Sequence, residues 1–333
     1  MVATQGLRFS VLSPALNEAA RLPAMLESIR RQNYPSDLVE VLVADGGSTD
    51  ETVAIAQSFG ASVFHNPVRR AEPGVGLLFE KASGDVAIVM AADNAFSDED
   101  FLARLARPFE DPEIAAAFPA VVSTARDGAT TQYFNAFTDP FNHFVYGGAA
   151  SPASYSRTYP VKRRTDDYVV YDFTRGPMPL LALAQAFAVR LPYRKPSGTA
   201  EYDLTPVEEL VSQGRDIAFV ARAGVEHHTV KDIGDALRKF GPRFRARMTD
   251  SGLPVWERLR ASSRAQRLRA YLWPFYSISF ALPAVAAAYG LVRDRRSEWL
   301  YHPFLSAVFG FEFWRQAAIV AFERLEWGSR RAD

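Results

Sequence analysis

Two acidic side chains follow hydrophobic segments that are typical of buried β-strands. Residues 39–44 are almost entirely apolar and rich in valine, and Asp45 follows them directly. Residues 85–90 contain a second run of this kind, and Asp93 lies just beyond it. Short apolar runs indicate strands of a parallel sheet that is covered on both faces. Open α/β sheets bind ligands at the carboxyl ends of such strands, so both carboxylates are expected in a ligand site.

A glycine turn and a helix start follow Asp45. Gly46 and Gly47 allow a backbone to approach a ligand closely, because neither residue carries a Cβ atom. Ser48 or Thr49 can then cap the next helix. An ordinary strand–turn–helix connection in which Asp45 is a capping residue would give the same pattern. This motif alone therefore leaves a structural and a ligand-binding interpretation open.

Alternating strands and helices position these residues. The alternation favours right-handed βαβ crossovers, and it predicts an α/β fold with a mostly parallel sheet flanked by helices. The pattern breaks at residues 125–196, which are rich in aromatic residues, Pro and Gly and indicate either functional loops or a variable insertion. We expect strands at 9–14, 39–44, 62–65, 85–90, 115–123 and 217–220, and helices at 19–32, 50–59, 178–189 and 206–213.

Composition and charge narrow the class of protein. The 333 residues are 48% apolar and 23% charged, as in a globular protein. The 38 basic and 38 acidic residues give a net charge of zero, so no global field favours nucleic acid. The absence of cysteine excludes disulfides, thiolate metal sites and cysteine nucleophiles. A first strand that begins by about Phe9 leaves no room for a secretory signal, which predicts a cytoplasmic location.

Four motifs in one order resemble the family-2 glycosyltransferases, which have the GT-A fold. The resemblance covers roughly residues 8–250. It implies a Rossmann-like sheet, an inverting reaction, a nucleotide-diphosphate sugar as donor, and Mg²⁺ or Mn²⁺ as cofactor. The motifs are Pro14-Ala15-Leu16-Asn17-Glu18, Asp45-Gly46-Gly47-Ser48-Thr49-Asp50, Ala91-Ala92-Asp93, and Thr199-Ala200-Glu201-Tyr202-Asp203-Leu204 before a helix that ends at Gly214.

The resemblance also implies a role for individual residues on the donor side. Asp45 would hydrogen-bond the nucleobase, and Glu18 would lie near the ribose or the base. Arg70 falls where the family often has a basic residue near the nucleotide, although neighbouring Arg69 competes for the role. Further substrate-binding positions within or next to these motifs are Pro14, Asn17, Gly46, Asp93 and Asn94.

Catalytic and metal-binding roles follow from the same resemblance. Glu201 matches the position of the catalytic carboxylate, which is more often Asp, and Asp203 is a neighbouring candidate. Asp93 matches the last acid of an Asp-x-Asp motif whose first position here is Ala91. His227 matches a histidine that contacts metal or diphosphate in many members, and His228 could replace it by a one-residue shift. Asp93 and His227 are therefore the expected metal ligands.

Two hydrophobic segments follow the predicted catalytic domain. Tyr271 to Val292 contains no charged residue and is long enough to cross a bilayer. Residues 299–322 are similar in length but contain Glu312 and Arg315. Arginines precede and follow the first segment, which disfavours a spanning hairpin and favours helices that lie on the membrane or enter one leaflet. Packing against the catalytic domain or in a homodimer is the alternative.

The predicted organisation is a catalytic domain at 1–250 followed by these helices at 251–333. Residues 1–124 would bind the nucleotide sugar, and residues 125–250 would bind the acceptor. We expect an inverting transferase at the cytoplasmic face of a membrane, with a lipid-linked or saccharide acceptor. Alternatives are a degenerate binding module, supported by Ala91, and a nucleotidyltransferase, although residues 13–21 lack the expected glycine-rich basic signature.

Overall fold

The computed structural model describes residues 6–193, 205–249 and 263–329. The chain divides into two compact units, Met1–Thr124 with Ser154–His228, and Ala125–Ala153 with Thr229–Asp333. We name them the sheet unit and the helical unit. The helical unit includes residues 125–153 and 229–249, which the sequence placed in a catalytic domain of residues 1–250.

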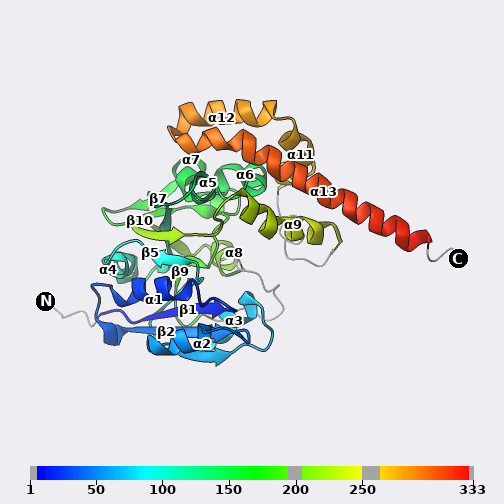
Figure 1. Ribbon diagram of the computed structural model, residues 1–333. Coiled ribbons are helices and arrows are strands. Elements are labelled where there is room, and N and C mark those ends of the chain that lie inside the picture. The colour runs from blue at the N-terminus through cyan, green and yellow to red at the C-terminus, as the bar shows by residue number, and fades with distance from the viewer. Residues whose placement is uncertain (1–5, 194–204, 250–262, 330–333) are drawn as a thin grey trace. The chain divides into compact units, whose positions relative to one another are not determined.

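A ten-stranded sheet forms the centre of the sheet unit (Figure 1). Its order is β3-β2-β1-β4-β9-β6-β10-β8-β7, and β5 pairs with β10 outside this path. The predicted mostly parallel sheet is confirmed. Strands β5, β8 and β9 run antiparallel to their neighbours, and the other strands all run in one direction. The strands are β1 Phe9–Ala15, β2 Val39–Asp45, β3 Ser62–His65, β4 Val86–Met90, β5 Asn94–Phe96, β6 Ile114–Val122, β7 Val161–Arg164, β8 Val169–Tyr171, β9 Gln185–Arg190 and β10 Asp216–His227.

Strand β1 lies in the sheet between β2 and β4, the two strands that lead to the acidic motifs. It pairs in parallel with β2 on one side and with β4 on the other, and Phe9 is opposite both Val39 and Val86. Because the three strands run in one direction, their carboxyl ends meet at one edge of the sheet. Asp45 ends β2, and Asp93 follows β4 by three residues, so both acids lie at that edge.

Helices cover the sheet and close its core. In α1 the buried residues Leu22, Met25, Leu26 and Ile29 repeat with helical spacing and join the core beneath the sheet. Helix α3 packs on β1 and β2 (Figure 1). The helices of this unit are α1 Leu22–Arg30, α2 Thr52–Ser58, α3 Ala71–Lys81, α4 Phe101–Ala106, α7 Tyr155–Thr158 and α8 Thr205–Ser212.

The predicted helix at 178–189 is wrong. Residues 185–190 form strand β9, which is inserted between β4 and β6 and pairs antiparallel with both. A central strand is buried on both faces, and Ala186, Phe187, Ala188 and Val189 are all buried. Such a strand shows no alternation of apolar and polar residues, so periodicity does not distinguish it from a buried helix.

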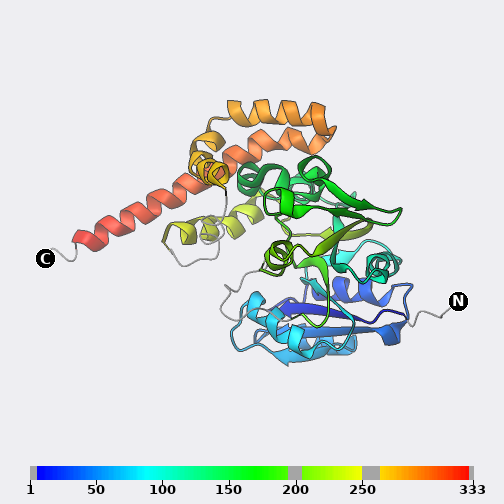
Figure 2. The ribbon, with the colours of Figure 1, turned by 180° about the vertical axis from the view of Figure 1, so that it is seen from behind.

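The helical unit is built around aromatic side chains. Phe134, Phe240 and Phe309 contact one another with ring centroids 5.3–6.0 Å apart. Helices α12 and α13 run beside each other in both views (Figures 1 and 2). The helices of this unit are α5 Ala129–Phe137, α6 Pro140–Tyr146, α9 Ile233–Thr249, α11 Arg264–Ile278, α12 Ala281–Asp294 and α13 His302–Ser329.

The uncharged segment at 271–292 is broken in the middle. It belongs to α11 and α12, whose axes differ by 101°, and Phe280 between them has a φ of 52°. Within the described ranges, no single helix satisfies the length and hydropathy required to cross a membrane. The bent pair α11–α12 satisfies them only when both helices are taken together. The first expected hydrophobic helix, at 271–292, is therefore divided into two short helices at a steep angle, and the second, at 299–322, lies largely in α13.

A buried histidine, His302, and a half-buried one, His143, lie in the core of the helical unit. The Tyr133 hydroxyl is 2.6 Å from Nδ1 of His302, and the Tyr276 hydroxyl is 2.9 Å from Nε2. Burial lowers the pKa of His302 to about 3 and that of His143 to about 4, each from an ordinary value near 6.5. The unfolded chain therefore binds more protons than the folded chain below about pH 6.5.

Acidification should destabilise this core. Each histidine that stays neutral in the folded state lowers the free energy of unfolding by roughly 2 kcal/mol between pH 7 and pH 5. Thermal unfolding followed by circular dichroism at the two pH values measures the effect. His143→Phe should reduce the pH dependence, whereas His65→Phe, at an exposed position, should leave it unchanged. An identical pH dependence in the parent and His143→Phe would contradict the assignment.

Candidate functional site

Asp45 organises the turn that follows β2. Its side chain is only 7% exposed, and its carboxylate accepts hydrogen bonds from the backbone N–H of Gly47 at 2.9 Å and of Ser48 at 3.1 Å. Gly47 has a φ of +86°, a conformation that side chains disfavour. Asp45 thus stabilises the turn, but it does not cap α2, whose N-cap residue is Glu51 without a side-chain hydrogen bond. The contact of Asp45 with a nucleobase stays a prediction.

Asn17 ties the loop after β1 to the loop after β2. Its side-chain Oδ1 accepts a hydrogen bond from the Thr49 N–H at 2.8 Å. Its backbone N–H donates to the Ser48 Oγ at 2.9 Å. Asn17 adopts a φ of 56°, which Asn tolerates better than most residues. Two motifs that lie about thirty residues apart in sequence therefore form one connected surface.

Glu18 and Asp50 extend the same connection. The Glu18 N–H donates to the Thr52 Oγ1 at 2.8 Å, and the Glu18 side chain lies 3.3 Å from Arg21. The hydrogen bond from the Thr52 hydroxyl is the main cause that lowers the pKa of Asp50. Asp50 therefore remains a carboxylate next to the loop. Pro14, the first residue of the loop motif, lies within β1 opposite Ala44.

The loop before α3 brings Arg70 to this region. Asn66 is buried, its N–H donates to the Asp45 carbonyl at 2.7 Å, and its Nδ2 donates to the Arg70 carbonyl at 2.8 Å. The Arg70 side chain is 58% exposed and lies 3.7 Å from Glu72. Gly46 allows close approach here, since a Cβ on it would lie 3.4 Å from the Cα of Arg69. Sequence reasoning missed Asn66.

Asp93 and His227 lie at neighbouring strand ends. Asn94 of β5 is opposite His227 of β10, and the His228 N–H donates to the Asp93 carbonyl at 3.1 Å. Asp93 and His227 are both half-buried. The Asn94 Nδ2 donates to the Ala184 carbonyl at 2.5 Å, whereas its Oδ1 is buried without a hydrogen-bond partner. The backbone pairing thus places the two residues expected to bind metal next to each other, and their contact with a metal stays a prediction.

Gln185 is a further member of this group. Its Nε2 lies 3.2 Å from Nδ1 of His227, and it is carried by β9. No sequence signal identifies Gln185, because the segment that carries it is predicted to be a helix. The contact fixes the His227 ring and leaves its other nitrogen to face a different partner.

The donor set partly fits a divalent cation. A carboxylate and an imidazole are suitable ligands for Mn²⁺, and Mg²⁺ accepts a carboxylate with diphosphate oxygens. Among the residues that the structure describes, no group of three or more acidic or histidine side chains is placed to hold a metal ion. Asp93 and His227 would therefore depend on the diphosphate of a substrate to complete a coordination shell. Glu201 and Asp203, the expected catalytic residues, lie outside the described residues.

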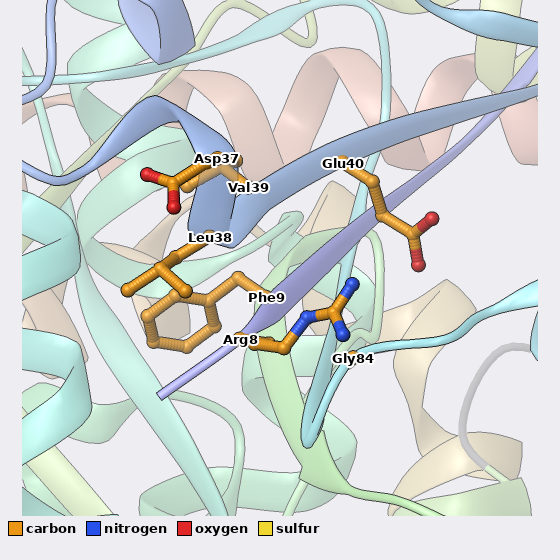
Figure 3. Close-up of a pocket in the computed structure, with 7 residues that line it drawn as sticks. All are labelled: Arg8, Phe9, Asp37, Leu38, Val39, Glu40 and Gly84. Carbon is orange, nitrogen blue, oxygen red and sulfur yellow. The ribbon is translucent and has the colours of Figure 1, made fainter. Parts of the chain in front are cut away.

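A small pocket lies at the opposite edge of the sheet. Figure 3 shows Arg8, Phe9 and Glu40 around it, at the amino ends of β1 and β2. Burial would raise the pKa of Glu40, but hydrogen bonds from Ser10 and Ser83 outweigh it and lower the pKa. These bonds join the starts of neighbouring strands. The pocket is therefore best explained as part of the packing, away from the acidic motifs.

The arrangement defines a class of fold, the GT-A fold of glycosyltransferases. The chain is similar to a mannosyltransferase from Pyrobaculum calidifontis solved with GDP-Man and Mn²⁺, with a TM-score of 0.53, 16% identity, and coverage of 93% of this chain and 86% of that one. It is also similar to residues 1–349 of S. aureus TarS in complex with UDP-GlcNAc, with a TM-score of 0.50, 12% identity, and coverage of 92% and 90%. At these identities the likeness establishes the fold alone.

A family model then specifies the assignment. Residues 10–170 match the model described as glycosyl transferase family 2, and this part of the chain belongs to that family. A PGL/p-HBAD biosynthesis glycosyltransferase from Mycobacterium bovis is 36% identical over 104 residues, which cover 29% of this chain and 40% of that protein. A dolichyl N-acetyl-alpha-D-glucosaminyl phosphate glucuronosyltransferase from Methanococcus voltae is 28% identical over 100 residues, 28% of this chain and 31% of that protein. The matches thus span less than half of these curated relatives.

Replacing Asn17 tests how the two loops are connected. Asn17→Ala removes the acceptor for Thr49 and places a Cβ at positive φ without a compensating hydrogen bond. Asn17→Gly removes the same acceptor but relieves the backbone. We expect Asn17→Gly to be more stable than Asn17→Ala by about 1 kcal/mol and less stable than the parent by about 1 kcal/mol. Urea unfolding measures both differences, and equal stability of all three proteins would contradict the geometry.

Proposed function

We propose that the chain is an inverting glycosyltransferase that transfers a sugar from a UDP- or GDP-linked donor to a lipid-linked or saccharide acceptor at a membrane surface. The observation that carries this proposal is the position of Asp45, Asp93 and His227 at one edge of the sheet in a family-2 domain. A nucleotide-diphosphate sugar has a base at one end and a charged diphosphate further along. The site offers groups suited to each.

The spacing of the strands supports an elongated ligand. Strand β1 separates β2 from β4, so the ends of β2 and β4 are two strand spacings apart, or roughly 10 Å. One small group cannot contact Asp45 and Asp93 together at that separation. A nucleotide whose base lies near Asp45 and Glu18, and whose diphosphate lies near Asp93 and His227, would extend across β1.

The reaction needs a leaving diphosphate and an activated acceptor. A divalent cation held by Asp93 and His227 would offset the negative charge that develops on the diphosphate. Glu201, with Asp203 as the alternative, would accept the proton of an acceptor hydroxyl on the opposite face of the sugar. Displacement in a single step from that face inverts the anomeric carbon.

Two features support a lipid-linked acceptor. One relative is described as acting on a dolichyl phosphate sugar, and another belongs to PGL/p-HBAD biosynthesis. The uncharged segment 271–292 of α11 and α12 would keep the chain near such a substrate at the cytoplasmic face of a membrane. A homodimer formed through these helices is the competing arrangement.

A second candidate is a transferase-like domain that binds nucleotides without catalysis. Ala91 occupies the first position of the metal motif, and no group of three ligands is found among the described residues. Turnover, and not binding, distinguishes the two candidates.

Asp93→Ala and Glu201→Gln separate the proposed roles. Asp93→Ala should lower turnover by at least about a hundredfold, since it removes a metal ligand. Glu201→Gln should lower turnover by a similar factor while nucleotide affinity stays near that of the parent, because a base acts on the acceptor. Release of UDP or GDP from a nucleotide sugar measures turnover, and isothermal titration measures affinity. Full activity of Glu201→Gln with the acceptor would exclude it as the base, and Asp203→Asn would then be tested.

A thermal-shift screen tests the donor site without an acceptor. UDP or GDP with Mn²⁺ should raise Tm, because a ligand that binds only the folded state stabilises it. Asp45→Ala should reduce the shift for the cognate nucleotide. Asp37→Ala, at an exposed position near the opposite edge of the sheet, is the matched control and should keep it. No shift with any nucleotide diphosphate would argue against the proposed donor.

A further inference from the structure

Large apolar side chains are exposed throughout the C-terminal helices. Helix α12 shows this most clearly, because its buried residues Pro283, Ala287 and Gly290 form one narrow stripe. Gly290 lies against the ring of Trp299, which precedes α13. The exposed large hydrophobic residues of this part of the chain are Leu268, Tyr271, Leu272, Phe275, Ile278, Phe280, Leu282, Val285, Tyr289, Leu291, Val292, Leu300, Tyr301, Phe304, Phe311, Trp314 and Phe322.

The outward face of α12 is apolar along its whole length. Leu282, Val285, Tyr289 and Val292 are 57%, 69%, 65% and 80% exposed. They follow one another at intervals of three, four and three residues, which places them on one side of a helix. A helix on the surface of a water-soluble unit normally carries polar residues on that side. This face therefore has the composition of a buried surface. At its end the guanidinium carbon of Arg293 lies 5.1 Å from the centroid of the Tyr289 ring.

The apolar surface continues beyond α12. Phe280, at the bend between α11 and α12, is 55% exposed. On α11, Phe275 is 62% exposed and its ring lies 5.8 Å from that of Trp314 on α13. The exposed face of α11 therefore adjoins apolar residues of α13. Patches larger than a few hundred Å² mark interaction sites in proteins.

Arginines stand at both ends of the uncharged segment. Residues 264–301 contain six arginines and two carboxylates, a net charge of +4, and no charge lies between residues 270 and 292. Arg264 and Arg269 are exposed at the start of α11, and Arg295 and Arg296 are exposed after α12. A positively charged surface repels a second copy of itself but is attracted to anionic lipid.

We infer that this surface, defined by α12, the bend at Phe280 and the exposed side of α11, binds an anionic lipid bilayer. Helix α12 lies in the interface with Leu282, Val285, Tyr289 and Val292 in the acyl region, and the flanking arginines contact lipid phosphates. The 101° bend prevents α11 and α12 from forming one straight span and favours a position in the plane of the interface. The inference deepens the proposed function by naming its lipid partner, but vesicle binding requires no sugar transfer.

Vesicle sedimentation of the full-length protein tests this inference. Vesicles of phosphatidylcholine with phosphatidylglycerol should pellet the protein more strongly than phosphatidylcholine alone. The double substitution Val285→Glu and Tyr289→Glu should weaken binding by at least about tenfold, because it places charges in the acyl region. Val161→Glu, a 44% exposed apolar residue of β7, is the matched control and should bind as the parent does.

The arginines are tested separately. Arg295→Gln should weaken binding to anionic vesicles by about fivefold and leave binding to neutral vesicles unchanged. Added salt should likewise weaken binding of the parent protein to anionic vesicles.

Two results would overturn the inference. One is undiminished sedimentation of the Val285→Glu and Tyr289→Glu protein, with circular dichroism showing that it is folded. The other is a parent protein that ignores vesicles and forms a dimer that these substitutions dissociate, which would make a second copy the occupant. A normal nucleotide-induced Tm shift in the same variant would show that the donor site is intact, so failure of lipid binding and failure of the donor site are distinguishable.

Discussion

The candidate site depends on the parallel pairing of β1 with both β2 and β4. The pairing fixes the direction of three strands and therefore brings their carboxyl ends to one edge. Asp45 and Asp93 then lie at this edge although they are far apart in sequence. The orientation of side chains in the loops can form a site only because this pairing places the loops at the same edge. A shift of one residue in either pairing would turn the side chains of that strand to the other face.

Hydrogen bonds then give the edge its shape. The Asn17 side chain holds the backbone of the loop after β2, whereas Asp45 and Asn66 use their side chains to hold backbone groups of their own loops. The Asn66 N–H joins the loop after β3 to the carbonyl of Asp45. The loops after β1, β2 and β3 are therefore joined before any ligand arrives. On the other side, the pairing of β5 with β10 brings Asp93 and His227 together. A preorganised site of this kind loses less conformational entropy when a ligand binds.

Sequence reasoning located the first half of the fold and the donor side of the site. Each strand from β1 to β4 lies in a segment that the sequence predicts as a strand. Asp45 ends β2, and Asp93 follows β4 by three residues. Sequence reasoning failed where pairing between strands that are distant in sequence determines the structure. The run that forms β9 is apolar on both faces, and the short strands β5, β7 and β8 gain their structure from β10 and from each other. Gln185 was missed for that reason, and the break at Phe280 lies inside a segment that looks continuous by hydropathy.

The composition of the helical unit has a consequence for biosynthesis. Its core joins Tyr133 to His302, which lie 169 residues apart. At about 5–20 residues per second, a ribosome needs on the order of ten seconds or more to reach the second partner after making the first. During that interval the aromatic side chains of α5 have no native core to enter. A nascent chain therefore presents these rings to chaperones, or to a nearby bilayer, while the rest of the polypeptide is still being made.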